Sequence, residues 1–163
     1  VSGSMNRDDR IGKLKGQMSN LLTALQNKSD KLRYGILTFG DRVDSCFPAK
    51  GMALNDEKNH KQAVQFVDRI QAGGGTPMCE AFNHALTRIL PEGNIDTLVF
   101  LSDGQPSDGT PAMVLDLAQR IHTQFKVRIH CISIGEEAEP GSTEPSLLKQ
   151  IADACGGTFT VPP

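Results

Sequence analysis

Segments with the length and composition of β-strands alternate along the chain with segments that have the period of an amphipathic helix. In the helical segments apolar residues recur every three or four positions, the spacing of one helix face. The predicted helices lie at residues 8–26, 59–71, 77–90, 111–125 and 144–155. The strand-like segments are short, apolar and bounded by turn residues. The predicted strands lie at residues 31–39, 43–47, 96–101, 127–134 and 158–161.

This alternation predicts an α/β fold, doubly wound and Rossmann-like, with a mostly parallel sheet and helices on both faces. Only three residues separate segment 31–39 from segment 43–47. So short a connection favours a hairpin and therefore one antiparallel strand at the edge of the sheet. With 163 residues the chain is long enough to bury a full core. We therefore expect a single domain over residues 1–163.

The composition excludes some classes of partner. The net charge is −2, and the chain has no Trp and one Tyr. A nucleic-acid partner requires a clustered basic surface or aromatic residues on which bases stack, so we expect none. No apolar run approaches the roughly 18–20 residues that cross a bilayer as a helix, and we expect no membrane span in this chain.

The four cysteines, Cys46, Cys79, Cys131 and Cys155, form no Cys-x-x-Cys pair and no Cys/His cluster at zinc spacing. They could form two disulfides in any of three pairings. A chain of this size does not need disulfides to fold, so we expect reduced thiols buried as small apolar groups. Reduced thiols favour a cytoplasmic location, whereas disulfides would indicate an extracellular one.

Three separate fragments carry hydroxyl or carboxylate oxygens. Ser2 and Ser4 precede the first predicted helix, Thr76 lies in a glycine-rich loop, and Asp103 directly follows a predicted strand. Hard oxygen ligands of this kind suit a divalent cation such as Mg²⁺. Because ligands bind at the carboxyl ends of strands in open α/β sheets, we expect the fragments to converge.

Each fragment alone has an ordinary structural explanation. Ser2 and Ser4 could cap a helix, Thr76 could be another N-cap, and Asp103 followed by Gly104 is a common turn pair. The joint occurrence of the three fragments in this order favours a metal site.

The fragments and the order of helices and strands resemble the von Willebrand factor A (VWA) domain family and its metal-ion-dependent adhesion site (MIDAS). The family pattern is Asp-x-Ser-x-Ser, then a Thr, then an Asp. Ser2 and Ser4 match the two serines, Thr76 the threonine and Asp103 the second aspartate. The resemblance implies Mg²⁺ as the cation, with Mn²⁺ or Ca²⁺ as alternatives. It also implies direct coordination by the three hydroxyls and a water-mediated role for Asp103.

The first aspartate of the family pattern would stand immediately before Val1. In the family fold, the strand that leads to this aspartate is the centre of the sheet, and none of the five predicted strands corresponds to it. We therefore expect an apolar run that ends in Asp directly upstream of Val1. A truncated domain that is completed by a strand from a partner is the alternative.

The resemblance implies a binding module without enzymatic activity, within a larger protein or complex. Its cation would coordinate an Asp or Glu of a protein partner, and we expect the contact surface at residues 2–6, 74–78 and 103–108. One alternative is a metal-assisted phosphoryl-transfer enzyme with Asp103 as nucleophile, although the chain has no Gly-x-x-x-x-Gly-Lys loop. The other is a VWA-fold scaffold with a degenerate metal site.

Overall fold

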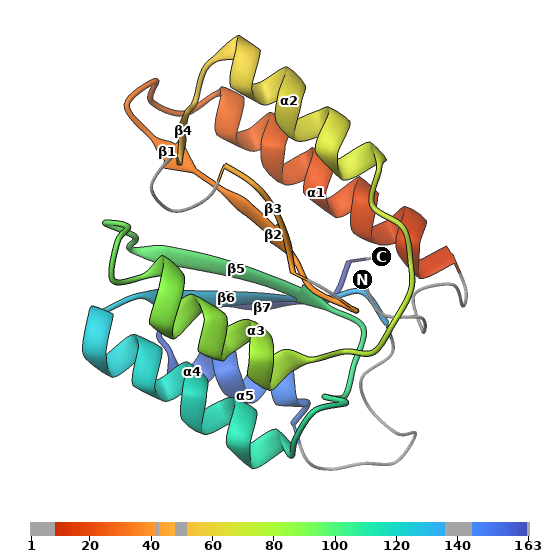
Figure 1. The fold of residues 1–163 in the computed structure, drawn as a ribbon, viewed down its shortest axis with the longest axis vertical. Coiled ribbons are helices and arrows are strands. Elements are labelled where there is room, and N and C mark those ends of the chain that lie inside the picture. The colour runs from red at the N-terminus through yellow and green to blue at the C-terminus, as the bar shows by residue number, and fades with distance from the viewer. Residues whose placement is uncertain (1–8, 42, 48–51, 136–144, 163) are drawn as a thin grey trace. The chain divides into compact units, whose positions relative to one another are not determined.

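The computed structural model describes residues 9–41, 43–47, 52–135 and 145–162 (Figure 1). The chain divides into two compact units, Val1–Gly74 and Gly75–Pro163. Each unit has its own helices and its own paired strands. Among the described residues, no helix combines the length and the apolar character that crossing a membrane requires.

The first unit contains two helices and four short strands in its described part. In chain order these are α1 (Arg10–Gln26), β1 (Arg33–Tyr34), β2 (Ile36–Thr38), β3 (Asp44–Cys46), β4 (Ala53–Leu54) and α2 (Glu57–Asp68). Helix α1 packs against α2, and the Lys15 Nζ donates a hydrogen bond to the Asp68 carbonyl at 2.7 Å. Asp56 caps α2 by accepting the Asn59 N–H at 2.8 Å. This cap places the start of α2 two residues before the predicted start at 59.

The strand predicted at 31–39 is instead two separate strands. Strand β1 pairs with β4, whereas β2 pairs with β3, both antiparallel. The division falls at Gly35, where a Cβ atom would lie 2.6 Å from the Phe47 carbonyl oxygen. The backbones approach so closely there that only glycine fits. The predicted hairpin is confirmed as β2 and β3, whereas β4 was not predicted because two residues carry no periodicity.

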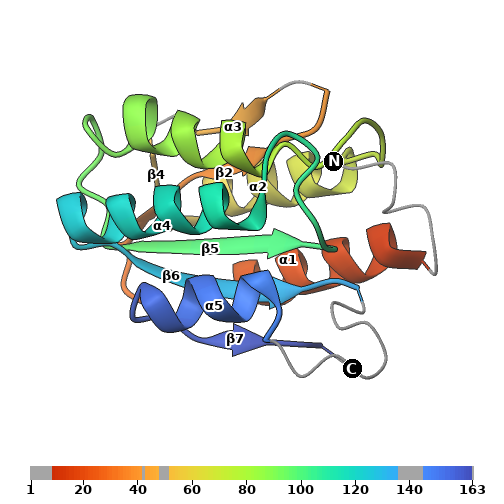
Figure 2. The same cartoon turned by 90° about the horizontal axis from the view of Figure 1, so that it is seen from below.

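The second unit is built on a parallel sheet. Its elements are α3 (Met78–His84), the π-helix η3 (Ala85–Ile89), β5 (Thr97–Ser102), α4 (Pro111–Phe125), β6 (Arg128–Ser133), α5 (Leu147–Ala154) and β7 (Phe159–Thr160). The strand order is β5-β6-β7, and Figure 2 shows the three arrows pointing the same way. Because all three are parallel, their carboxyl ends lie at one edge of the sheet.

Helices α3, α4 and α5 lie on the same face of this sheet (Figure 1). Ile129 and Cys131 of β6 are fully buried against them, whereas Val99, on the opposite face of β5, is exposed. The fully buried residues of the helices include Met78, Val114, Ala118, Ile121, Leu148 and Ile151. This core anchors the strand ends and helix starts on which the candidate site lies.

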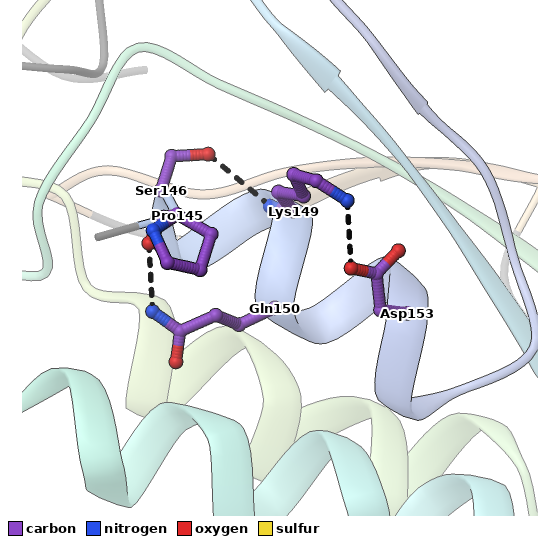
Figure 3. A network of polar contacts seen from close by, with 5 residues as sticks. All are labelled: Pro145, Ser146, Lys149, Gln150 and Asp153. Atoms are coloured by element: carbon purple, nitrogen blue, oxygen red, sulfur yellow. Dashed lines mark hydrogen bonds and ion pairs between the residues drawn. The ribbon is translucent and has the colours of Figure 1, made fainter. Parts of the chain in front are cut away.

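Helix α5 begins at a side-chain cap, shown in Figure 3. The Ser146 Oγ accepts the Lys149 N–H at 3.3 Å, and the Gln150 Nε2 donates to the Pro145 carbonyl at 2.8 Å. The cap sets the observed start at Leu147, three residues after the predicted start at 144, a residue outside the described part.

The predicted fold class is confirmed. The described residues form five α-helices, a three-stranded parallel sheet and two antiparallel strand pairs, as expected of a Rossmann-like α/β protein.

Candidate metal centre

Thr76 lies in the loop that enters α3 and is 8% exposed. Its carbonyl accepts the Met78 N–H at 2.8 Å, which turns the chain into the helix. Pro77, at the N-cap position, provides no side-chain cap. Ser107 contacts the backbone of Thr76 through the Thr76 N–H and carbonyl, and neither of these bonds uses the Thr76 hydroxyl.

Asp103 directly follows β5 and is 6% exposed. The strand ends there because Gly104 adopts a φ of 153°, outside the range that residues with a side chain favour. The Ser102 carbonyl accepts the Ile134 N–H at 2.8 Å and so holds the end of β5 beside the end of β6. Asp103 therefore lies at the carboxyl edge of the parallel sheet, as predicted.

Ser107 joins the Thr76 loop to the Asp103 loop through two reciprocal hydrogen bonds. The Thr76 N–H donates to Ser107 Oγ at 2.8 Å, and the Ser107 N–H donates to the Thr76 carbonyl at 2.9 Å. A Cβ atom on Gly75 would lie 2.6 Å from Ser107 Oγ, so a larger residue there would displace the Ser107 hydroxyl. These contacts bring together the two loops that carry Thr76 and Asp103, two of the four predicted site residues.

Asp108 caps α3 from this second loop. Its two carboxylate oxygens accept the N–H groups of Cys79 at 3.1 Å and Glu80 at 2.8 Å. The first N–H groups of a helix have no partner within the helix, and a negative charge is favourable at that end. Burial, and then the Asp108 charge, raise the pKa of the Cys79 thiol above its ordinary value. Gly109 lies against the same sulfur atom.

The structure describes two of the four predicted site residues. Thr76 and Asp103 are both buried on loops that Ser107 holds together. Ser2 and Ser4 lie outside the described residues. Among the described residues, no cluster of three or more His, Cys, Asp or Glu side chains could hold a metal ion. The predicted ligand set has one carboxylate and three hydroxyls, so it does not depend on such a cluster.

Sequence reasoning placed Ser107 and Asp108 within or beside the expected contact surface but missed what they do. Their bonds reach across 28 to 31 positions of sequence. A helix cap is recognised in sequence by residues within a few positions of the helix start, so a remote cap leaves no local pattern. The available signal was the turn-forming composition of Ser107-Asp108-Gly109.

The buried oxygens suit a hard cation. A carboxylate and neutral hydroxyls match the oxygen coordination that Mg²⁺ requires, and they leave part of its charge uncompensated. The residues that the structure describes are therefore compatible with a divalent cation, with Thr76 and Asp103 as the residues that would hold it.

Comparison with protein families shows the family to which the chain belongs. The family described as "von Willebrand factor type A domain" matches residues 4–161, nearly the whole chain. The chain belongs to the von Willebrand factor type A family. Domains of this family are often adhesion or protein-interaction modules. The match includes both compact units, so the VWA assignment applies to the chain as a whole.

Solved structures support the VWA assignment. A von Willebrand factor type A protein from Catenulispora acidiphila has a TM-score of 0.77 and 25% identity over 99% of this chain and 36% of its own. The manganese-loaded TRAP protein of Plasmodium vivax has a TM-score of 0.72 and 18% identity over 99% of this chain and 64% of its own. Proximal thread matrix protein 1 from the mussel byssus, with a zinc-occupied MIDAS motif, has a TM-score of 0.64 and 16% identity over 98% of this chain and 40% of its own.

The VWA chain is shorter than these proteins and spans between 36% and 64% of their lengths. The two structures below 25% identity show a shared fold. A comparison with curated protein sequences gave no significant match.

Proposed function

We propose that this VWA domain is a protein-interaction module without enzymatic activity, which binds its partner through a divalent cation held by Ser2, Ser4, Thr76 and Asp103. The observation that carries the proposal is the reciprocal pair of hydrogen bonds between Thr76 and Ser107. That pair fixes the threonine loop to the loop that begins at Asp103.

The role of each side chain follows from its chemistry. Thr76 offers a neutral hydroxyl oxygen, and Asp103 offers a negative charge in a buried position. The hydroxyls of Ser2 and Ser4 would complete the oxygens that these four residues offer. Three neutral oxygens and one carboxylate do not balance a charge of +2. A partner's Asp or Glu would supply the missing charge, which makes binding selective for acidic residues.

Mg²⁺ is the proposed cation, with Mn²⁺ or Ca²⁺ as alternatives. Mg²⁺ prefers oxygen ligands in an octahedral arrangement and keeps several of its waters, which agrees with a water-mediated role for Asp103. The manganese in the TRAP structure and the zinc in the mussel structure support a divalent cation in this fold.

The proposal extends to domain organisation and location. We place residues 1–163 in one VWA domain, and the family match across residues 4–161 supports this. We also propose a cytoplasmic location, supported by the absence of disulfides among the four cysteines, all of which the structure describes. Thiol counting on the unfolded, unreduced protein should find four reactive thiols. A count of two or none would contradict the location.

To test the interaction, the full-length protein is purified in Mg²⁺ and the proteins retained with it are identified. Their retention should be lost in chelator and in Thr76→Ala, which leaves the hydrogen bonds of the Thr76 backbone in place. Thr123→Ala, an exposed threonine of α4, is the matched control and should retain the partner. Replacing the partner's contact Asp or Glu by Asn or Gln should abolish retention. A partner that is retained equally by Thr76→Ala and in chelator would contradict the proposal.

A further inference from the structure

Ser107 controls the conformation of one residue, Thr76, from both sides. It accepts the Thr76 N–H with its hydroxyl and donates its own N–H to the Thr76 carbonyl. Two bonds on either side of the same Cα fix the orientation of the Thr76 backbone. The remaining freedom is rotation about χ1, which is restricted in a β-branched residue. The position of the Thr76 hydroxyl therefore depends on Ser107.

The hydrogen bond between the Thr76 N–H and the Ser107 hydroxyl does not cap a helix. Thr76 precedes Pro77, the N-cap of α3, so its N–H is not one of the unpaired amides of the first helical turn. Asp108 already caps that turn through the Cys79 and Glu80 N–H groups. Gly75, which has no side chain, gives Ser107 Oγ the room to reach the Thr76 N–H. The Ser107 hydroxyl thus acts on Thr76 itself.

We propose that Ser107 is a positioning residue for the cation, acting through the Thr76 hydroxyl without contacting the cation, an inference that rests on the proposed function. Asp108 holds the following helical turn to the same loop. Residues that orient metal ligands in this way typically change metal affinity by about 10- to 100-fold when they are removed.

The test is a Mn²⁺ titration of the full-length protein, followed by electron paramagnetic resonance of the unbound ion. The variants are Ser107→Ala, Thr76→Ala, the double variant and Ser146→Ala. Ser146 is the matched control because its Oγ also accepts a backbone N–H in the same unit, at the start of α5 (Figure 3). Ser107→Ala should weaken Mn²⁺ binding about tenfold or more, and Ser146→Ala by less than about twofold, as expected of a site it does not touch.

The double variant separates positioning from general stability. If Ser107 acts through the Thr76 hydroxyl, then Ser107→Ala should weaken Mn²⁺ binding no further once Thr76 is alanine, because interacting residues are not additive. Additive losses would overturn the inference, as would a Ser107→Ala variant that binds Mn²⁺ as tightly as Ser146→Ala.

A metal-free measurement accompanies the titration. Exchange of the Thr76 amide hydrogen, followed by NMR, should be faster in Ser107→Ala than in Ser146→Ala, because only Ser107→Ala removes its acceptor. Unchanged exchange would overturn the inference. A wild-type protein that binds no Mn²⁺ would overturn the proposed function together with this inference. If the wild type binds Mn²⁺ and Ser107→Ala binds it equally tightly, only this inference is overturned.

Discussion

Thr76 and Ser107, 31 positions apart in the chain, exchange two hydrogen bonds: the Thr76 N–H donates to the Ser107 hydroxyl at 2.8 Å, and the Ser107 N–H donates to the Thr76 carbonyl at 2.9 Å. The exchange fastens the loop that enters α3 to the loop that leaves β5. Binding residues concentrate on loops that a rigid scaffold positions. Here the parallel strands β5 and β6 provide that scaffold, and the two bonds to Ser107 hold Thr76 in place relative to it.

Asp108→Ala should destabilise the protein by about 1–3 kcal/mol, because it leaves two N–H groups at the start of α3 without their acceptor. Urea unfolding measures the change. Asp116→Ala is the control, since Asp116 is an exposed residue of α4 whose loss should change the free energy of unfolding by less than about 0.5 kcal/mol. Equal stability of the two variants would show that Asp108 does not cap α3 in solution.

Asp108→Asn should make the Cys79 thiol more acidic. Burial is the larger cause of the raised Cys79 pKa, and the Asp108 charge adds to it. Removing the charge lowers the pKa of Cys79, so more thiolate forms at a given pH and alkylation accelerates. Alkylation rates of the Cys79 peptide across pH, read by mass spectrometry, should show a midpoint at lower pH than in the wild type. A midpoint that stays in place or moves upward would contradict this electrostatic coupling.

Stability should fall as the pH rises from about 9 to 11, in part because of Cys155. Burial raises the pKa of this fully buried thiol from 9.0 to about 11 in the folded state. Between these values the unfolded chain releases the proton while the folded chain retains it, so rising pH favours unfolding. Urea unfolding at several pH values should show a steeper loss for the wild type than for Cys155→Ala. Parallel pH profiles would refute this role of Cys155.

Where local signals decide a structure, the sequence predicted it closely. Helix α4 was predicted at 111–125 and spans Pro111–Phe125. Thr110 caps it, Pro111 suits its first turn, and its apolar residues recur at helical spacing. The strand segment 31–39 was mispredicted because its division at Gly35 depends on the carbonyl of Phe47, a residue 12 positions away that directly follows β3.

In the candidate site, too, some residues were predicted from local sequence signals and others were not. Thr76 and Asp103 were placed at a helix start and a strand end because topology requires it, and the structure agrees. Ser107 and Asp108 act through bonds between loops that are distant in sequence. Their roles depend on the packing of α3 beside the loop after β5, and sequence periodicity does not report that packing.

Isothermal titration of the full-length protein with Mg²⁺ shows whether Thr76 and Asp103 hold a cation. We expect one Mg²⁺ to bind per chain. We also expect a loss of affinity of about tenfold or more in Thr76→Ala and Asp103→Ala, because each removes an oxygen that would hold the cation. Thr123→Ala and Asp116→Ala make the same chemical changes at exposed positions of α4 and should bind like the wild type. A wild type that binds no Mg²⁺, or Thr76→Ala and Asp103→Ala variants that bind it as tightly as their controls, would show that these residues hold no cation.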